Sequence, residues 1–293
     1  MGKRLAIYLA VTFGLSWGLW IPAGIALGTF EHGVGSSAIM FALVAIGMFF
    51  PLAGALAAQA ACKNDDPFEL RLRPCVGGIV PWYVAAWLAP AALALLGAAV
   101  YFVLMPQEFD PTMTSYLSLM AQQSGTDLSE MPLPPAALMA LTALSALTYA
   151  PFLNMLFAFG EEAGWRGMLY PVLAQRMSQR AAALASGVIW GVWHAPIIAM
   201  GHNYGMGYAG FPLLGILTMT LACTAMGVCM AYLWQRTENV WPCALAHGSF
   251  NAVANLGVAL AASGQTVLGP SPLALLAGIP LFALGIACLL RLK

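Results

Sequence analysis

Charged side chains are scarce in this sequence. Only 8% of its 293 residues are Asp, Glu, Lys or Arg, whereas 61% are hydrophobic, and the formal net charge is zero. A water-soluble domain usually carries about 25% charged residues. A bilayer, by contrast, accepts apolar side chains on the outside of helices that satisfy their own backbone groups. The composition therefore excludes a water-soluble globule and predicts an integral membrane protein.

Two further absences narrow the classes of function. The six cysteines form no CxxC pair and show no regular spacing, so we expect neither a disulfide framework nor a cysteine-rich metal site. Without a net positive charge there is no reason to expect nucleic acid as a partner. We expect membrane lipid to surround the protein, and we expect it in the bacterial inner membrane.

Long apolar runs are abundant instead. About 20 mostly apolar residues cross the hydrocarbon core of a bilayer. This rule predicts an all-α, polytopic bundle of about eight transmembrane helices that form a single domain, residues 1–293. The predicted spans lie near residues 5–28, 36–61, 78–104, 135–160, 181–200, 211–235, 242–263 and 271–291.

The basic residues support this count, because every Lys and Arg falls on one side of the eight-span arrangement. The opposite connections contain none; they lie near residues 29–35, 105–133, 201–210 and 264–270. Cytoplasmic loops are the ones enriched in Lys and Arg. The sequence therefore predicts that both termini are cytoplasmic.

Two local features carry additional expectations. The GxxxG spacings Gly24/Gly28 and Gly187/Gly191 are typical of close helix contacts in membranes. The long outer connection, residues 106–135, is either an ordinary polar connector or contains a short interfacial helix in the stretch TSYLSLMAQQ.

Polar residues inside or at the ends of the spans are costly and usually functional. The first such cluster ends the fourth span. Glu162 and Arg166 are four residues apart, so they share a helical face and are expected to form an ion pair. Glu161 points about 100° away around the helix and stays available for chemistry. The alternative is that these residues form a solvated helix end.

Two further clusters contain histidine. His194 lies in the fifth span, where Pro196 breaks the helix shortly after it; the alternative is a histidine that only packs. His247 and Asn251, in the seventh span, are four residues apart on one helical face; the alternative is an interhelical hydrogen-bond pair. The other two histidines fall in outer connections and are expected to face water.

In this order, the three clusters resemble the motifs of the CPBP family, which contains CAAX prenyl proteases of type II and bacteriocin-processing, Abi-type proteins. The family motifs are EExxxR, an aromatic residue separated by three residues from a histidine, and HxxxN. They are matched here by Glu161, Glu162 and Arg166, by Trp190 and His194, and by His247 and Asn251. Trp190 departs from the phenylalanine that is commoner at its position. The resemblance covers a core of about residues 135–263.

The resemblance implies an eight-helix intramembrane endopeptidase whose site opens toward the cytoplasm. Glu161 would be the general base that activates water, and His194 would hold that water. His247 and Asn251 would donate to the tetrahedral oxyanion. The second glutamate and the arginine of the first motif would fix the catalytic glutamate. Peptide hydrolysis does require a base and oxyanion donors of these kinds.

A metal-dependent version of this chemistry remains open. Glu161, His194 and His247 together are a ligand set found in catalytic zinc sites, although no HExxH motif is present. Members of the family have been described both as metalloproteases and as glutamate-dependent peptidases. We favour glutamate chemistry without a cofactor, with zinc as the alternative.

Two other functions compete with a peptidase. Intramembrane Glu and His residues also serve proton-coupled transporters, but the two halves of the sequence show no inverted repeat. A non-catalytic scaffold or immunity-type protein would not need all four polar residues of the proposed site. For the peptidase, we expect a peptide or protein substrate that reaches the site from the bilayer or the cytoplasmic face.

Overall fold

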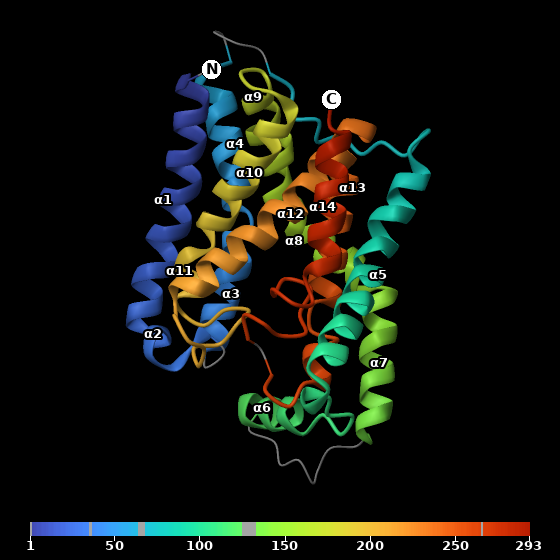
Figure 1. The fold of residues 1–293 in the computed structure, drawn as a ribbon. Helices are drawn as coiled ribbons and strands as arrows, with labels where there is room; N and C mark the ends of the chain where they lie inside the picture. The colour runs from blue at the N-terminus through green and yellow to red at the C-terminus, as the bar shows by residue number, and fades with distance from the viewer. Residues whose placement is uncertain (1, 35–36, 64–67, 125–132, 265) are drawn as a thin grey trace.

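The computed structural model describes residues 2–34, 37–63, 68–124, 133–264 and 266–293. These residues form a helical bundle, and their β-pairing is limited to one isolated bridge between Phe109 and Ala261. The prediction of an all-α protein is confirmed. In chain order (Figure 1) the elements are α1 (Gly2–Ala26), α2 (Thr29–His32), α3 (Ala38–Gly47), α4 (Phe50–Ala61), α5 (Val80–Leu104), η2 (Pro106–Glu108), α6 (Thr114–Ser124), α7 (Pro135–Leu147), α8 (Ala150–Gly164), η4 (Trp165–Leu169), α9 (Tyr170–Ala174), α10 (Gln179–Trp193), α11 (Ala195–Ile198), α12 (Leu213–Thr237), α13 (Val240–Val253), η5 (Val258–Leu260) and α14 (Ile279–Arg291).

Five helical segments in the described residues are long and apolar enough to cross a bilayer, and the number is six if the bent pair formed by α7 and α8–α9 counts as one span. Large apolar side chains such as Leu95, Val103 and Leu217 are mostly exposed on the outside of the bundle. Water would disfavour such a surface, whereas lipid tails do not. The chain is a multi-pass integral membrane protein.

The predicted number of eight spans is not confirmed and stays a prediction. Helices α10 and α14 contain 15 and 13 residues, fewer than the spans predicted near 181–200 and 271–291. At 1.5 Å per residue, each is shorter than the roughly 30 Å hydrocarbon core. The backbone leaves α10 at His194, just before Pro196, and the residues before Ile279 form turns rather than helix. Near 135–160, the chain bends by 52° between α7 and α8.

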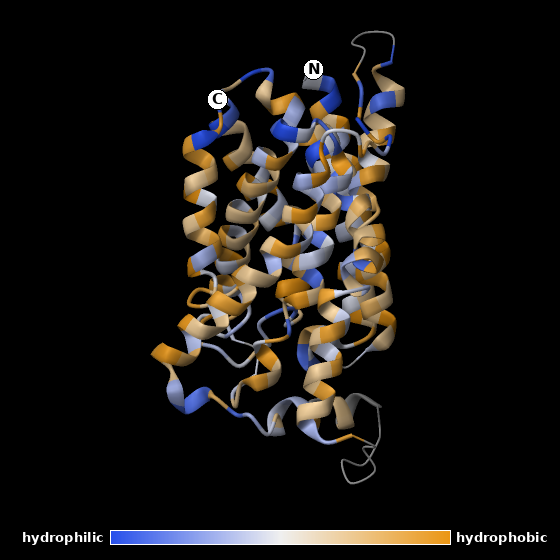
Figure 2. Cartoon of the chain, turned by 90° about the vertical axis from the view of Figure 1, so that its right-hand side faces the viewer, coloured by the Kyte–Doolittle hydropathy of each residue, from blue (hydrophilic) through white to orange (hydrophobic). Residues whose placement is uncertain are grey.

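Both chain ends and α9 lie at one end of the bundle, and α6 lies at the other (Figure 1). Figure 2 shows most hydrophilic segments at these two ends. The cytoplasmic orientation of the termini stays a prediction. Residues 114–124 do form a helix, α6. Arg166, which was expected in a basic connection, is instead buried within the bundle, because the helix continues through it.

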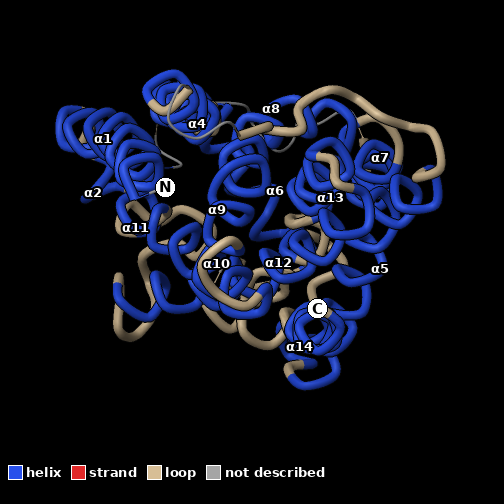
Figure 3. The backbone as a smooth tube through the Cα atoms, turned by 90° about the horizontal axis from the view of Figure 1, so that it is seen from above, coloured by secondary structure: helices blue, strands red, loops and turns tan. Residues whose placement is uncertain are grey.

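The helices that carry the three polar clusters lie in the middle of the bundle. Seen from the end that carries the termini (Figure 3), α1 and α4 lie at one edge, α8 lies between α4 and α13, and α10 and α12 lie near the centre. Helix α8 packs against α13 and α4, and α10 packs against α12. This arrangement brings segments that are distant in the sequence to one place.

The glycine spacing in α10 explains its close approach to α12. A Cβ atom on Gly187 would lie 2.6 Å from Cα of Thr224, and one on Gly191 would lie 2.4 Å from Cα of Thr220. The two backbones are therefore in direct contact, as this spacing predicts. Gly24 instead packs against the side chains of Phe30, in α2, and of Met200, in the turn after α11.

Candidate active site

The first polar cluster lies where α8 changes its helical geometry. Helix α8 continues through a π-helical turn, η4, into α9. Such turns are rare and are frequent at functional sites. Glu161 and Glu162, at the end of α8, are only 3% and 0% exposed. The alternative of a solvated helix end is therefore wrong, and both carboxylates point into the protein interior.

Glu161 is oriented by two indole groups. Its Oε2 accepts hydrogen bonds from Nε1 of Trp190 at 2.7 Å and from Nε1 of Trp165 at 3.2 Å. No hydrogen bond from another described residue reaches its Oε1. One oxygen therefore fixes the carboxylate, while the other remains available to a reacting molecule.

Glu162 joins α8 to α13. Its Oε1 accepts a hydrogen bond from Nη1 of Arg166 at 3.0 Å and lies 3.0 Å from Nδ1 of His247. The predicted Glu162–Arg166 ion pair is confirmed. Glu162 itself points toward His247, and the expectation that this pair fixes Glu161 stays a prediction. Arg166 instead lies over the ring of Trp190, 4.5 Å from its centroid, and so reaches Glu161 through that tryptophan.

His194 follows α10 directly and is buried. Its Nδ1 lies 2.9 Å from the carbonyl oxygen of Trp190. Because a carbonyl oxygen only accepts, Nδ1 carries the proton, and Nε2 of the neutral ring is an acceptor. Sγ of Cys223 lies 3.8 Å from the same Nδ1. His194 can therefore accept a hydrogen bond from water through Nε2.

His247 and Asn251 lie one turn apart on α13. His247 is buried and is directed at Glu162, whereas Asn251 is half-buried. Within the described residues, no hydrogen bond joins Asn251 to Glu161, His194 or His247. The structure thus brings the glutamates and the two histidines together, and Asn251 lies one turn from His247 on α13.

A glycine next to His247 permits this contact. A Cβ atom on Gly248 would lie 2.4 Å from the backbone nitrogen of Met155 and 2.6 Å from the carbonyl oxygen of Pro151, both on α8. Only a residue without a side chain allows α13 to approach α8 so closely. This approach brings His247 within reach of Glu162.

Trp190 lies at the centre of the cluster. Its indole donates to Glu161 and its carbonyl accepts from His194. Its ring centroid is 5.2 Å from that of His247, and the guanidinium of Arg166 lies over it. The sequence assigned this residue only the role of an aromatic wall. The structure shows that it contacts all three motifs.

Sequence reasoning missed two parts of the site. Trp165 follows Glu161 by four residues, a spacing that could have identified it as a partner on the same helical face. The other part is α1, which carries no motif. Trp193 Nε1 donates to Oγ of Ser16 at 2.8 Å, and Trp17 Nε1 donates to the carbonyl oxygen of Trp193 at 3.0 Å. Helix α1 therefore fixes the turn from which His194 projects.

The zinc alternative can be compared with this geometry. In the part of the chain that the structure describes, no three His, Cys, Asp or Glu side chains come together as a group that could hold a metal ion. Nδ1 of His194 and Nδ1 of His247 are directed at other protein atoms, as described above. This arrangement leaves available Nε2 of both rings, the nitrogen that faces a metal when Nδ1 is held by a carbonyl or carboxylate, so the choice between glutamate and zinc chemistry stays a prediction. Of the remaining histidines, His32 is exposed as expected, whereas His202 is half-buried.

Comparison with known proteins finds a family match for the part of the chain that carries these residues. Residues 140–253 match the model of the family described as "Type II CAAX prenyl endopeptidase Rce1-like". This segment, less than half of the chain, is similar to that family. The matched segment contains all four residues of the proposed site: Glu161, His194, His247 and Asn251. The family resemblance expected from the three motifs is confirmed.

A curated relative has a local match with the same chain. The protein named CAAX prenyl protease 2 from Methanococcus maripaludis is 40% identical over 53 residues. This match covers 18% of the present chain and 20% of the relative. The similarity to the relative is therefore confined to about a fifth of its length.

Proposed function

We propose that this chain is an intramembrane endopeptidase in which Glu161 activates a water molecule. The observation that supports the proposal most is the asymmetry of the Glu161 carboxylate. Two indole groups hold one oxygen, and the other has no protein partner among the described residues. A general base requires such a fixed orientation together with one oxygen that can take a proton.

The reaction proceeds by addition and elimination. As the water oxygen bonds to the carbonyl carbon of the substrate, one water proton passes to Glu161. His194 accepts the second water hydrogen through Nε2 and so orients the nucleophile. The proton on Glu161 then passes to the amide nitrogen as the C–N bond breaks. The products are a carboxylic acid and an amine, and the carboxylate of Glu161 is regenerated.

His247 and Asn251 would stabilise the oxyanion. Because Nδ1–H of His247 donates to Glu162, Nε2 is a donor only when the ring is an imidazolium. The carboxylate of Glu162 balances that positive charge. Asn251, one turn further along α13, supplies an amide donor. Removal of a single oxyanion donor in an enzyme typically costs about 3–4 kcal/mol of transition-state stabilisation.

The substrate class follows from the location of the site. A buried centre in a membrane bundle favours a membrane-associated peptide that enters from the bilayer or the cytoplasmic face. The name of the curated relative makes a prenylated C-terminal peptide the first class to test, and leader-type peptides are the second. We propose a cell membrane, the bacterial inner membrane, as the location.

Cleavage by the purified protein tests the proposal. The protein in detergent is incubated with quenched fluorescent peptides that include prenylated C-terminal and leader-type sequences. We expect the wild type to cleave at least one peptide and Glu161→Gln to cleave none. Glu31→Gln is the matched control, because it makes the same change at an exposed position and is expected to retain activity.

The outcomes separate the competing functions. Cleavage that persists in a strong chelator supports glutamate chemistry, whereas a loss that zinc restores supports a metal centre. Cleavage that survives Glu161→Gln contradicts the assignment of the base. If a folded wild type cleaves no peptide but conducts protons in liposomes, the transporter replaces the peptidase.

A further inference from the structure

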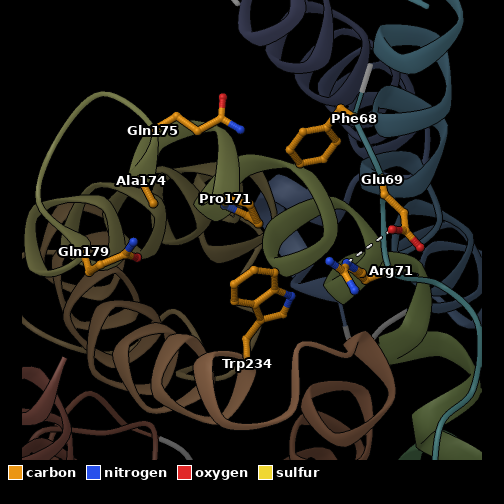
Figure 4. A pocket seen from close by; sticks show the side chains of 8 residues that line it. All are labelled: Phe68, Glu69, Arg71, Pro171, Ala174, Gln175, Gln179 and Trp234. Atoms are coloured by element: carbon orange, nitrogen blue, oxygen red, sulfur yellow. Dashed lines mark ion pairs between the residues drawn. The ribbon is translucent and has the colours of Figure 1, made fainter. Parts of the chain in front are cut away.

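A cavity outside the proposed catalytic cluster lies where three distant segments meet. Its volume is about 330 Å³, within the lower range of sites that hold a ligand. The segment that follows α4, helix α9 with the turn into α10, and the end of α12 form its walls (Figure 4). Apolar walls come from Phe68, Pro171 and Trp234, and polar groups come from Arg71, Gln175 and Gln179.

Trp234 provides the most specific feature of this cavity. Its Nε1 is buried and has no hydrogen-bond partner among the described residues. Buried donors are nearly always paired, so an unpaired one requires an explanation. Gln179 adds further donors, because its Oε1 already accepts from the hydroxyl of Tyr170 at 2.8 Å and its amide nitrogen remains available. The cavity therefore offers hydrogen-bond donors to a ligand that carries acceptors.

The wall opposite these donors is rigidly attached to the bundle. The carbonyl oxygen of Phe68 accepts from Nε2 of Gln59 at 2.6 Å. Nε1 of Trp241 donates to the carbonyl oxygen of Leu72 at 2.9 Å. Nδ2 of Asn239 donates to the carbonyl oxygen of Arg73 at 2.8 Å. Side chains of α4 and of the α13 N-terminus thus fix this segment. A pre-organised wall reduces the entropy that a ligand loses when it binds.

The charges of the lining favour a neutral ligand over an anion. Arg71 supplies the positive charge, and it lies 3.5 Å from Glu69 and 3.7 Å from Glu238. Two carboxylates therefore compensate one guanidinium, which does not favour a phosphate or a lipid headgroup. Apolar walls combined with neutral N–H donors match the carbonyl groups of a peptide backbone. We propose that this cavity binds an extended peptide segment of the substrate; the proposal rests on the peptidase function given above.

The distance to the catalytic cluster sets the position of that segment. Pro171 follows Glu161 by ten residues in one continuous helical stretch, α8–η4–α9, which corresponds to roughly 15 Å along the axis. An extended peptide advances about 3.3 Å per residue. The bound segment is therefore about four or five residues from the scissile bond.

Trp234→Phe tests the contact, because it removes the N–H group and keeps most of the ring. We expect KM to rise about fivefold for a substrate long enough to reach the cavity, the effect of one ordinary hydrogen bond, with kcat unchanged. A shortened substrate, with only two residues between the scissile bond and its end on the cavity side, should have the same KM with Trp234→Phe as with the wild type. Trp87→Phe is the matched control, because it removes an indole donor on α5, outside the cavity. An unchanged KM, or an equal change for long and short substrates, would overturn the proposal.

A cross-linking experiment separates this proposal from the peptidase function. Glu161→Gln protein is irradiated with peptides that carry a benzophenone at successive positions, and the attachment sites are mapped by mass spectrometry. Attachment to residues 68–71, 171–179 or 234 from any benzophenone position supports the peptide site. Where the wild type cleaves the same peptide, the attached position should lie four or five residues from the cleavage point. Attachment confined to other residues contradicts it. Because no cleavage is needed, an inactive wild type would contradict only the peptidase.

Discussion

Glu162 and His247 are 85 residues apart in the sequence, and yet Oε1 of Glu162 lies 3.0 Å from Nδ1 of His247 inside the bundle. The same oxygen accepts from Arg166. A single buried carboxylate oxygen therefore serves one partner on its own helix and another on α13. Removing the charge of Glu162 would leave a buried guanidinium without compensation and would release the histidine from its orientation.

This relationship predicts that Glu162→Gln impairs both stability and catalysis. The amide keeps the shape of the side chain but cannot balance Arg166 or an imidazolium at His247. Breaking a buried pair by neutralising one partner usually costs about 3–5 kcal/mol. We expect a clearly lower unfolding temperature in detergent and a loss of kcat larger than the loss of binding. Wild-type values for both quantities would contradict the role assigned to Glu162.

Trp190→Phe should impair catalysis with a smaller effect on folding. The variant keeps an aromatic ring beneath Arg166 but loses the N–H group that donates to Glu161. Hydrogen bonds to charged groups contribute about 1.5–3 kcal/mol, so kcat is expected to fall by about tenfold or more. Trp165→Phe removes the longer of the two hydrogen bonds and should have a smaller effect. Kinetics on the same peptide compare the two variants, and an unchanged kcat in Trp190→Phe would show that the indole does not orient Glu161.

Gly248→Ala should separate α13 from α8. The added Cβ would meet the backbone of Met155 and Pro151 rather than flexible side chains, and overpacking of this kind costs about 1–3 kcal/mol. We expect lower thermal stability and lower activity, because His247 moves away from Glu162. Gly14→Ala on α1 is the control, since nothing lies within 4 Å of its added Cβ. There the expected change in stability is zero or positive, because alanine favours helix by about 1 kcal/mol over glycine. Equal effects of the two substitutions would contradict this interpretation.

In the connection after α5, the carboxylate of Asp110 holds a turn whose stability depends on pH. The hydroxyl of Thr112 donates to its carboxylate, as do the backbone N–H groups of Thr112 and Thr114 at 2.9 and 2.8 Å. These hydrogen bonds lower the pKa of Asp110 from its ordinary value, and the bond from the Thr112 hydroxyl makes the largest contribution. A lowered pKa means that the stabilisation is present above the unfolded-state pKa, roughly 4, and is lost as the pH falls through the folded-state pKa.

Hydrogen exchange checks this expectation. Protection of the backbone N–H groups of Thr112 and Thr114 should persist from neutral pH to about 4 and decrease below it. Thr112→Val removes the hydroxyl donor, so it should raise the pKa of Asp110 and shift the loss of protection to higher pH. Protection that does not change with pH, or a shift in the opposite direction, would contradict the assignment.

Local spacing in the sequence predicted part of the site and missed contacts that depend on helix packing. The four-residue spacing of Glu162 and Arg166 sufficed to predict their ion pair, because both lie on one helix. The central position of Trp190 could not be predicted, since it depends on how α10 is rotated against α8 and α13. Trp165 could have been found by the same spacing rule that identified the ion pair.

The helix ends show a similar limit for the fold. Hydropathy detects apolar composition but does not detect where the backbone leaves the helix. For this reason the runs near 181–200 and 271–291 read as full spans, although α10 ends at Trp193 and α14 begins only at Ile279. Long uninterrupted runs such as α1, α5 and α12 were predicted within a few residues of their observed ends.

The contact between α1 and Trp193 determines whether the segment with the family motifs could keep its geometry when separated from the rest of the chain. The segment that carries the family signature, residues 140–253, contains Trp193 but neither Ser16 nor Trp17. A gene fragment for that segment would encode every motif residue and would still lack two of the groups that fix the turn before His194. The family motifs contain the residues of the proposed site, but the orientation of His194 also depends on α1, which carries no motif. We therefore expect that residues 140–253 alone would not reproduce the geometry of the site.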